Sequence, residues 1–140
     1  MPGVGRSVQL ASVTTGMVTA TVDTLLSGSY KGGTFVLDVT SAATAAGDTL
    51  NVYVQRLLAD GTYDDVVSFT QVLGNGGAVA FVADVLFDST ASDERVVQTG
   101  ALAAGTVNAV PMSHALRVSY VIVSVTAPDF DFTVTADLFN

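Results

Sequence analysis

Acidic side chains are the residues of this chain that could carry chemistry. Carboxylate oxygens are ligands for calcium, and a pair of carboxyl groups can also serve a glycosidase. The chain has a single histidine and no cysteine, which excludes a multi-histidine or a thiolate metal site. Three groups of Asp stand close together in the sequence: Asp64 with Asp65, Asp129 with Asp131, and the set Asp84, Asp88 and Asp93.

Turns explain these acidic groups without a ligand. Asp is common in turns because its side chain accepts hydrogen bonds from nearby backbone amides. Asp64 and Asp65 follow the Asp60-Gly61 turn, and Asp129 follows Pro128. The sequence has no twelve-residue calcium loop ending in Glu, and no Trp to form a sugar platform. We therefore expect solvated acidic turns, no cofactor and no enzyme, with a calcium site as the alternative.

The composition favours a β protein that folds as one domain. The 24 valines and 17 threonines stand against one Lys and one Glu, a bias toward strand formers and away from helix formers. A length of 140 residues fits a single domain, and 49% hydrophobic residues exclude disorder for most of it. The net charge is −8 and the five cations are scattered, so we expect no binding to nucleic acid or to an anionic membrane.

Alternating apolar residues predict short strands separated by turns. The clearest signal is a hairpin from Leu50 to Gln71 around Asp60-Gly61. The segment Leu116–Thr126 is apolar on both faces, which indicates a central strand or one covered by a partner. Eight or nine strands, with turns every ~8–12 residues, predict an all-β fold, an antiparallel β-sandwich of jelly-roll or Greek-key type. The predicted strands are Val8–Val13, Met17–Leu25, Thr34–Thr40, Leu50–Gln55, Val66–Gln71, Ala78–Leu86, Leu116–Thr126 and Phe130–Val134, with a weaker one in Ala101–Val110.

The sandwich is expected to span residues 8–140, after a flexible arm at residues 1–7 that Gly and Pro dominate. Phenylalanines on the strands are expected in the core. Tyrosines suit a contact surface better, because the ring buries area while the hydroxyl stays paired. The predicted contact residues, at an interface with a partner or within an oligomer, are Arg6, Tyr30, Tyr53, Tyr63 and Tyr120.

Long uncharged segments raise the question of a membrane. Val66–Ala83 and Val96–Leu116 carry no Asp, Glu, Lys or Arg, but Gly and Pro interrupt both, so a transmembrane helix is not expected. The N-terminus is a weak match to a signal peptide, so we expect synthesis in the cytoplasm without export. Charged residues are only 13% of the chain, which predicts that part of the surface is covered in an assembly.

The order of these alternating segments resembles a known family. The segments are Gly33–Thr40, Thr49–Gln55, Asp60–Gln71 with its DG turn, Leu116–Tyr120 and Phe130–Val134. Together they resemble small β-sandwich structural proteins encoded among the head genes of tailed bacteriophages, the capsid decoration or cement proteins with a jelly-roll-like fold. The resemblance covers roughly residues 16–136.

This resemblance implies a structural virion protein on the capsid surface, made in the cytoplasm of a host bacterium. The major capsid protein would be its partner, and it would form a homo-oligomer, a trimer or a dimer, on a capsid symmetry axis. The family offers no catalytic residues. The alternative is a phage tail or fibre module, or a carbohydrate-binding β-sandwich module that recognises host glycans, because a fold alone does not give a function.

Overall fold

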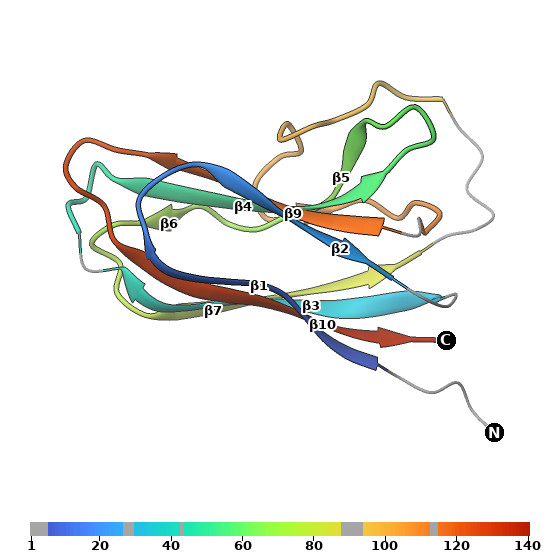
Figure 1. Ribbon diagram of the computed structural model, residues 1–140, viewed down its shortest axis with the longest axis horizontal. Coiled ribbons are helices and arrows are strands. Elements are labelled where there is room, and N and C mark those ends of the chain that lie inside the picture. Colours follow the sequence, from blue (N-terminus) through green and yellow to red (C-terminus); the bar gives the residue numbers. More distant parts are fainter. Residues whose placement is uncertain (1–5, 27–29, 43, 88–93, 113–114) are drawn as a thin grey trace.

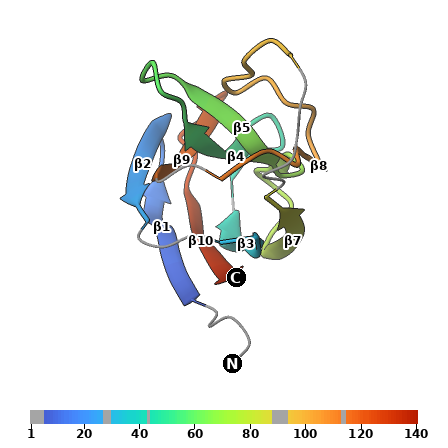
Figure 2. The same ribbon diagram turned by 90° about the vertical axis from the view of Figure 1, so that its right-hand side faces the viewer.

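Two antiparallel sheets pack face to face in the computed structural model, which describes residues 6–26, 30–42, 44–87, 94–112 and 115–140 (Figures 1 and 2). One sheet has the order β1-β10-β3-β7, and the other has the order β2-β9-β4-β5-β8 with β6 paired to β4. The strands are β1 (Arg6–Gly16), β2 (Ala20–Leu25), β3 (Gly32–Ala42), β4 (Thr49–Leu57), β5 (Tyr63–Ser68), β6 (Val72–Leu73), β7 (Val79–Leu86), β8 (Thr106–Val107), β9 (Ala115–Val123) and β10 (Phe130–Phe139).

The strand pairing is that of a jelly roll. The described residues form ten strands, not the eight or nine predicted, because the two-residue strands β6 and β8 add to eight longer ones. These eight pair antiparallel as β1 with β10, β2 with β9, β3 with β7 and β4 with β5, so the chain wraps as a folded ribbon from one sheet to the other. The predicted all-β antiparallel sandwich is therefore confirmed.

The core lies between the sheets and follows the alternation of the strands. Successive strand side chains point to opposite faces, so every second residue of β3, β4 and β10 is buried. Phe35, Phe69, Phe130 and Phe132 are buried as predicted, and Phe81 is partly buried against them. No helix long and apolar enough to cross a bilayer occurs in the described part of the chain.

The predicted hairpin is present and sets the geometry of the candidate site. β4 and β5 pair with Leu57 opposite Tyr63, Arg56 opposite Asp64 and Gln55 opposite Asp65. The turn closes with the amide of Leu58 donating to the carbonyl of Thr62 at 2.8 Å, and Gly61 adopts a φ of 88°, which glycine takes without steric cost. A one-residue register shift lies between Val54 and Gln55, so β5 bulges against β4.

Strand β9, which the sequence shows as apolar on both faces, lies between β2 and β4. Leu116, Val118 and Tyr120 fill the core, whereas Val123 is 52% exposed near its end. The strand is therefore central, as one of the two predicted alternatives has it, and the outward-facing Val121 beside the core residues is half-buried. The strand ends at Val123, three residues before the predicted end.

The first strand starts earlier than the sequence predicts. Arg6 pairs with Leu138 and Ser7 with Asp137 on β10, so both belong to the sheet and not to an arm. The rest of the predicted arm, residues 1–5, lies outside the described residues. β1 also runs past the predicted end at Val13, with a bulge between Val13 and Gly16 where the φ of Thr15 is 55°.

Candidate functional site

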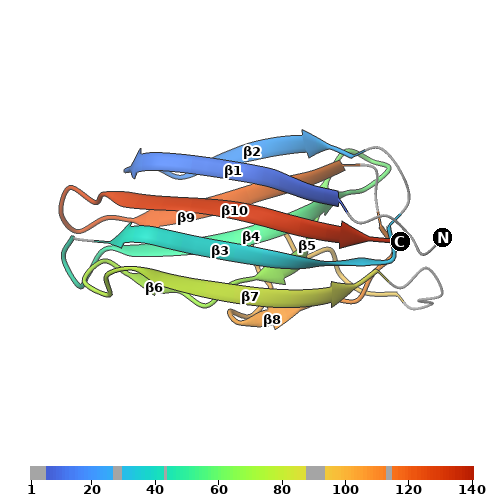
Figure 3. The ribbon, with the colours of Figure 1, turned by 90° about the horizontal axis from the view of Figure 1, so that it is seen from below.

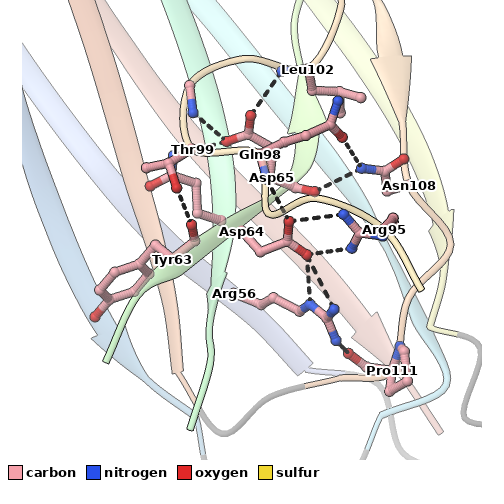
Figure 4. A network of polar contacts seen from close by, with 12 residues as sticks. Arg56, Tyr63, Asp64, Asp65, Arg95, Gln98, Thr99, Leu102, Asn108 and Pro111 are labelled. Carbon is pink, nitrogen blue, oxygen red and sulfur yellow. Dashed lines mark hydrogen bonds and ion pairs between the residues drawn. The ribbon is translucent and has the colours of Figure 1, made fainter. Parts of the chain in front are cut away.

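The most concentrated polar site surrounds Asp64 and Asp65 on β5 (Figure 4). Their exposed fractions are 1% and 0%, so the prediction of a solvated acidic turn is wrong for this pair. They are buried because residues 98–108 run along the edge of β5. The amide of Asp65 donates to the carbonyl of Gln98 at 2.7 Å, and the amide of Asn108 donates to the carbonyl of Val66 at 2.8 Å.

Asp64 pairs with two arginines from different segments. Arg56, its cross-strand neighbour, donates Nε and Nη2 to Oδ2 at 3.1 Å each. Arg95 donates Nη1 to Oδ1 at 3.0 Å and forms an ion pair through Nη2 with Oδ2. The amide of Gln98 completes the set at 3.1 Å from Oδ1. The guanidinium of Arg56 also reaches the carbonyl of Pro111, at 3.0 Å from Nη1.

These donors determine the charge state of Asp64. Desolvation by burial raises the pKa of its carboxyl group, but the hydrogen bonds from Arg95, Gln98 and Arg56 outweigh desolvation and hold that pKa below its usual value. Asp64 is therefore a carboxylate at neutral pH, with both oxygens accepting hydrogen bonds.

Asp65 faces the other side of β5 and binds backbone amides. Its Oδ1 accepts from the amide of Gly100 at 2.9 Å, and its Oδ2 accepts from the amides of Ala101 and Leu102 at 2.8 and 2.9 Å. Gln55, opposite on β4, donates Nε2 to Oδ1 at 2.8 Å. One carboxylate thus holds three successive amides, an arrangement that suits a negative charge.

The contacts of Asp64 and Asp65 hold residues 95–108 against β5. We call this set of contacts the Asp64 anchor. An open cavity of about 510 Å³ lies beside it, and Arg56, Leu58, Asp64, Glu94, Arg95, Val97, Val110 and Pro111 form its walls. A general base needs an oxygen within reach of a substrate proton. Each oxygen of Asp64 and Asp65 already accepts hydrogen bonds from the chain itself.

A third buried carboxylate, that of Asp48, stands at the opposite end of the sandwich. Asp48 has an exposed fraction of 0% and accepts from the amides of Val125 and Thr126 at 2.6 and 2.9 Å. The hydroxyl of Thr126 also donates to it. The hydroxyl and amide of Thr126 lower the pKa of Asp48 far below its usual value. Asp48 therefore ties the loop before β4 to the loop after β9.

The other predicted acidic groups do not converge. Asp131 accepts from the amide of Thr15 at 2.6 Å, and Asp129 is exposed. Asp84 accepts from the hydroxyl of Thr34 at 2.8 Å. Within the described ranges no three His, Cys, Asp or Glu side chains are grouped as metal ligands. Asp88, Asp93 and His114 lie outside the described residues.

The predicted contact residues take different positions. Tyr120 is 8% exposed and packs edge-to-face on Phe132 with ring centroids 5.3 Å apart, so it belongs to the core and not to a contact surface. Arg6 is exposed at the start of β1, and Tyr30 and Tyr53 are half-buried. Tyr63 is also half-buried, with the guanidinium of Arg117 at 3.6 Å from its ring centroid.

The sequence did not indicate that Arg95 and Gln98 bind Asp64. It also did not indicate that Asp48 is buried and ties two loops together. The sequence did carry a signal for the pair Arg56 and Asp64, because the Asp60-Gly61 turn fixes the hairpin register and places Arg56 opposite Asp64.

Comparisons with protein-family models, with curated proteins and with solved structures found no match.

Proposed function

We propose that this chain is a structural virion protein of a tailed bacteriophage, a capsid decoration protein that binds the shell of the major capsid protein and stabilises the head. The supporting observation is Val96-Val97, which the Asp64 anchor presents at the surface. Arg95 and Gln98 flank the two valines and both bind Asp64, while Val96 is 86% exposed and Val97 is 44% exposed.

A pre-ordered apolar contact suits a protein whose work is binding. A side chain that is already fixed loses less conformational entropy when a partner covers it. The buried polar atoms of the described side chains all have hydrogen-bond partners, so the anchor leaves no buried donor or acceptor without a bond. The polar groups of the anchor therefore serve to position the apolar side chains of Val96 and Val97.

Further apolar side chains are exposed at other places on the sandwich. Leu25 is 79% exposed, and Val18 and Val125 are 69% and 73% exposed. The turn between β1 and β2 meets the end of β9 through the hydroxyl of Thr19, which accepts from the amide of Ile122 at 3.0 Å. Several separated contacts support multivalent attachment at the joints between capsid subunits, where each weak contact raises the effective concentration of the others. We place the protein on the capsid surface, as a dimer or trimer.

The test is co-sedimentation of the purified protein with shells of the major capsid protein encoded in the same phage genome. The double variant Val96→Asp and Val97→Asp should bind at least about tenfold more weakly, because charges replace an apolar contact. The double variant Ser12→Asp and Thr14→Asp adds the same charge on the exposed side of β1 and should bind like the wild type.

Two outcomes would overturn the proposal. The first is wild-type protein that stays in the supernatant at all shell concentrations. The second is protein that co-purifies with tails or fibres and not with heads, which would support the tail or glycan-binding alternative. Binding to shells, weakened only by the valine variant, supports the proposal.

A further inference from the structure

β7 is a free edge of the sandwich. It ends the sheet β1-β10-β3-β7, and its pairing with β3 is regular from Val79 opposite Val39 to Leu86 opposite Gly32. Within the described residues no strand pairs with the other side of β7. In Figure 3, β7 and β8 lie along the same side of the molecule.

The free backbone groups of β7 can be assigned from the ladder. The amide of Phe87 donates to the carbonyl of Lys31 at 2.7 Å, which makes this a hydrogen-bonded pair. Hydrogen-bonded and non-hydrogen-bonded pairs alternate along an antiparallel ladder. The amides and carbonyls that point away from β3 therefore belong to Ala80, Val82, Asp84 and Leu86. The side chains of Val82 and Leu86 are 63% and 65% exposed beside them.

Among the edge strands in the described part of the chain, β7 has the longest regular register. Edges are commonly protected by bulges, short length, Pro or charge. β1 has two register shifts, β8 has two residues, and β2 carries Asp23 paired with Arg117. β7 has eight residues, an unbroken register and a single charge, Asp84.

A groove of about 370 Å³ lies beside this edge, between β7 and β8. Phe69, Phe81 and Val107 are among the residues that line it. Side chains of a strand added to β7 would point alternately into this groove and toward the outer face of the sheet. The inward positions of such a strand would therefore be apolar.

The outer face beside the edge is acidic. Asp38 and Asp84 stand on β3 and β7, and Asp131 and Asp137 stand on β10, on the side away from the core. With a net charge of −8, two copies of the chain joined at β7 would bring these faces together. Like charges on neighbouring strands are unfavourable, whereas a Lys or Arg opposite Asp84 is favourable.

We propose that β7 is the docking site for an extended segment of a partner protein, which adds to the sheet as a further strand. The segment has apolar side chains toward the groove and Lys or Arg toward Asp84. Main-chain hydrogen bonds supply the affinity of strand addition, and the alternating side chains supply the specificity. The proposal does not depend on whether the partner is a capsid protein.

The first test maps amide hydrogen exchange by NMR with a synthetic peptide. The probe is a nine-residue peptide that alternates Val with Lys or Thr, and its control replaces each Lys with Glu. The Lys peptide at saturation should slow exchange at Ala80, Val82, Asp84 and Leu86 by about tenfold or more, because free-edge amides gain acceptors. The Glu peptide should bind at least about tenfold more weakly.

The second test removes one donor from the edge. Val82→Pro deletes an amide that faces away from β3, so the ladder with β3 stays intact. Peptide affinity should fall about tenfold or more, whereas Val82→Thr keeps the amide and should bind within about threefold of the wild type. If the Pro variant does not fold, the exchange map of the wild type decides.

Three results would overturn the proposal. One is peptide binding that leaves the four amides unprotected, and another is equal binding by the Pro variant and the wild type. The third is protection that rises with protein concentration alone, which would assign the edge to a second copy of the chain.

Discussion

Two acidic pairs that are alike in sequence have opposite environments. Asp64 and Asp65 follow a Gly turn, and Asp129 and Asp131 flank the start of β10 after Pro128. The first pair is buried and each carboxylate accepts four or more hydrogen bonds, counting both oxygens. In the second pair Asp129 is exposed, and Asp131 is half-buried with the amide of Thr15 bonded to it.

The difference comes from a segment remote in the sequence. Residues 98–108 lie along β5 and bring the donors Gly100, Ala101 and Leu102 to Asp65. Asp129 remains at the surface. A turn near an Asp is thus a local property, whereas the burial of the Asp depends on what the rest of the chain places over it.

Removing Asp64 should have the largest effect on stability. Asp64→Ala leaves Arg56 and Arg95 without their carboxylate in a largely buried site, and breaking such a pair costs about 3–5 kcal/mol. The side chains of Arg56 and Arg95 are 18% and 28% exposed, so the lower end of this range is expected. Urea unfolding followed by circular dichroism measures the change. A loss below about 1 kcal/mol would mean that the anchor is not a stabilising structure.

Acid should act mainly through the buried carboxylates. The pKa values of Asp64 and Asp48 are lowered in the folded protein, so the unfolded chain, with Asp near pKa 3.9, binds protons more readily. Their contribution to stability is fully present above about pH 5 and is lost as the pH falls through about 4 and below. Urea midpoints at pH 7, 5 and 3 should show a plateau and then a fall.

A control separates titration from general weakening of the fold. Asp64→Asn should flatten the fall below pH 5, because it removes one of the titrating groups. Val67→Ala also destabilises the hairpin, through a cavity in the core, but it should keep the full acid dependence. Identical pH profiles for Asp64→Asn and the wild type would contradict the assignment.

The fold could be predicted because strand alternation is a local signal. Leu50, Val52 and Val54 mark β4, and Asp60-Gly61 marks the turn. The anchor could be predicted only in part. Hairpin register gives Arg56 opposite Asp64, but Arg95 comes from an irregular segment 31 residues away, and no periodicity in the sequence brings it to β5. Tyr120 was misplaced because an apolar strand face does not reveal which side meets the core.

Removing the carboxylate of Asp131, from the second pair, should have a smaller effect on stability. Asp131→Ala deletes an acceptor for the amide of Thr15, which lies at the bulge of β1 and can turn to water. A hydrogen bond of this kind contributes about 0.5–1.5 kcal/mol. The urea midpoint of Asp131→Ala should therefore fall about a third as far as that of Asp64→Ala. Equal losses for the two variants would remove the contrast between the pairs.

Chelation should have the smallest effect, none within error. If calcium stabilised the fold, Asp129 and Asp131 would be the pair available to it, since Asp64 and Asp65 are occupied by arginines and amides. Calcium takes six to eight oxygen ligands, and one oxygen of Asp131 is already bonded to Thr15. The melting temperature should be the same with excess chelator and with millimolar calcium. A drop of several degrees with chelator would show that the second pair binds a metal, and Asp131→Asn should then abolish that drop.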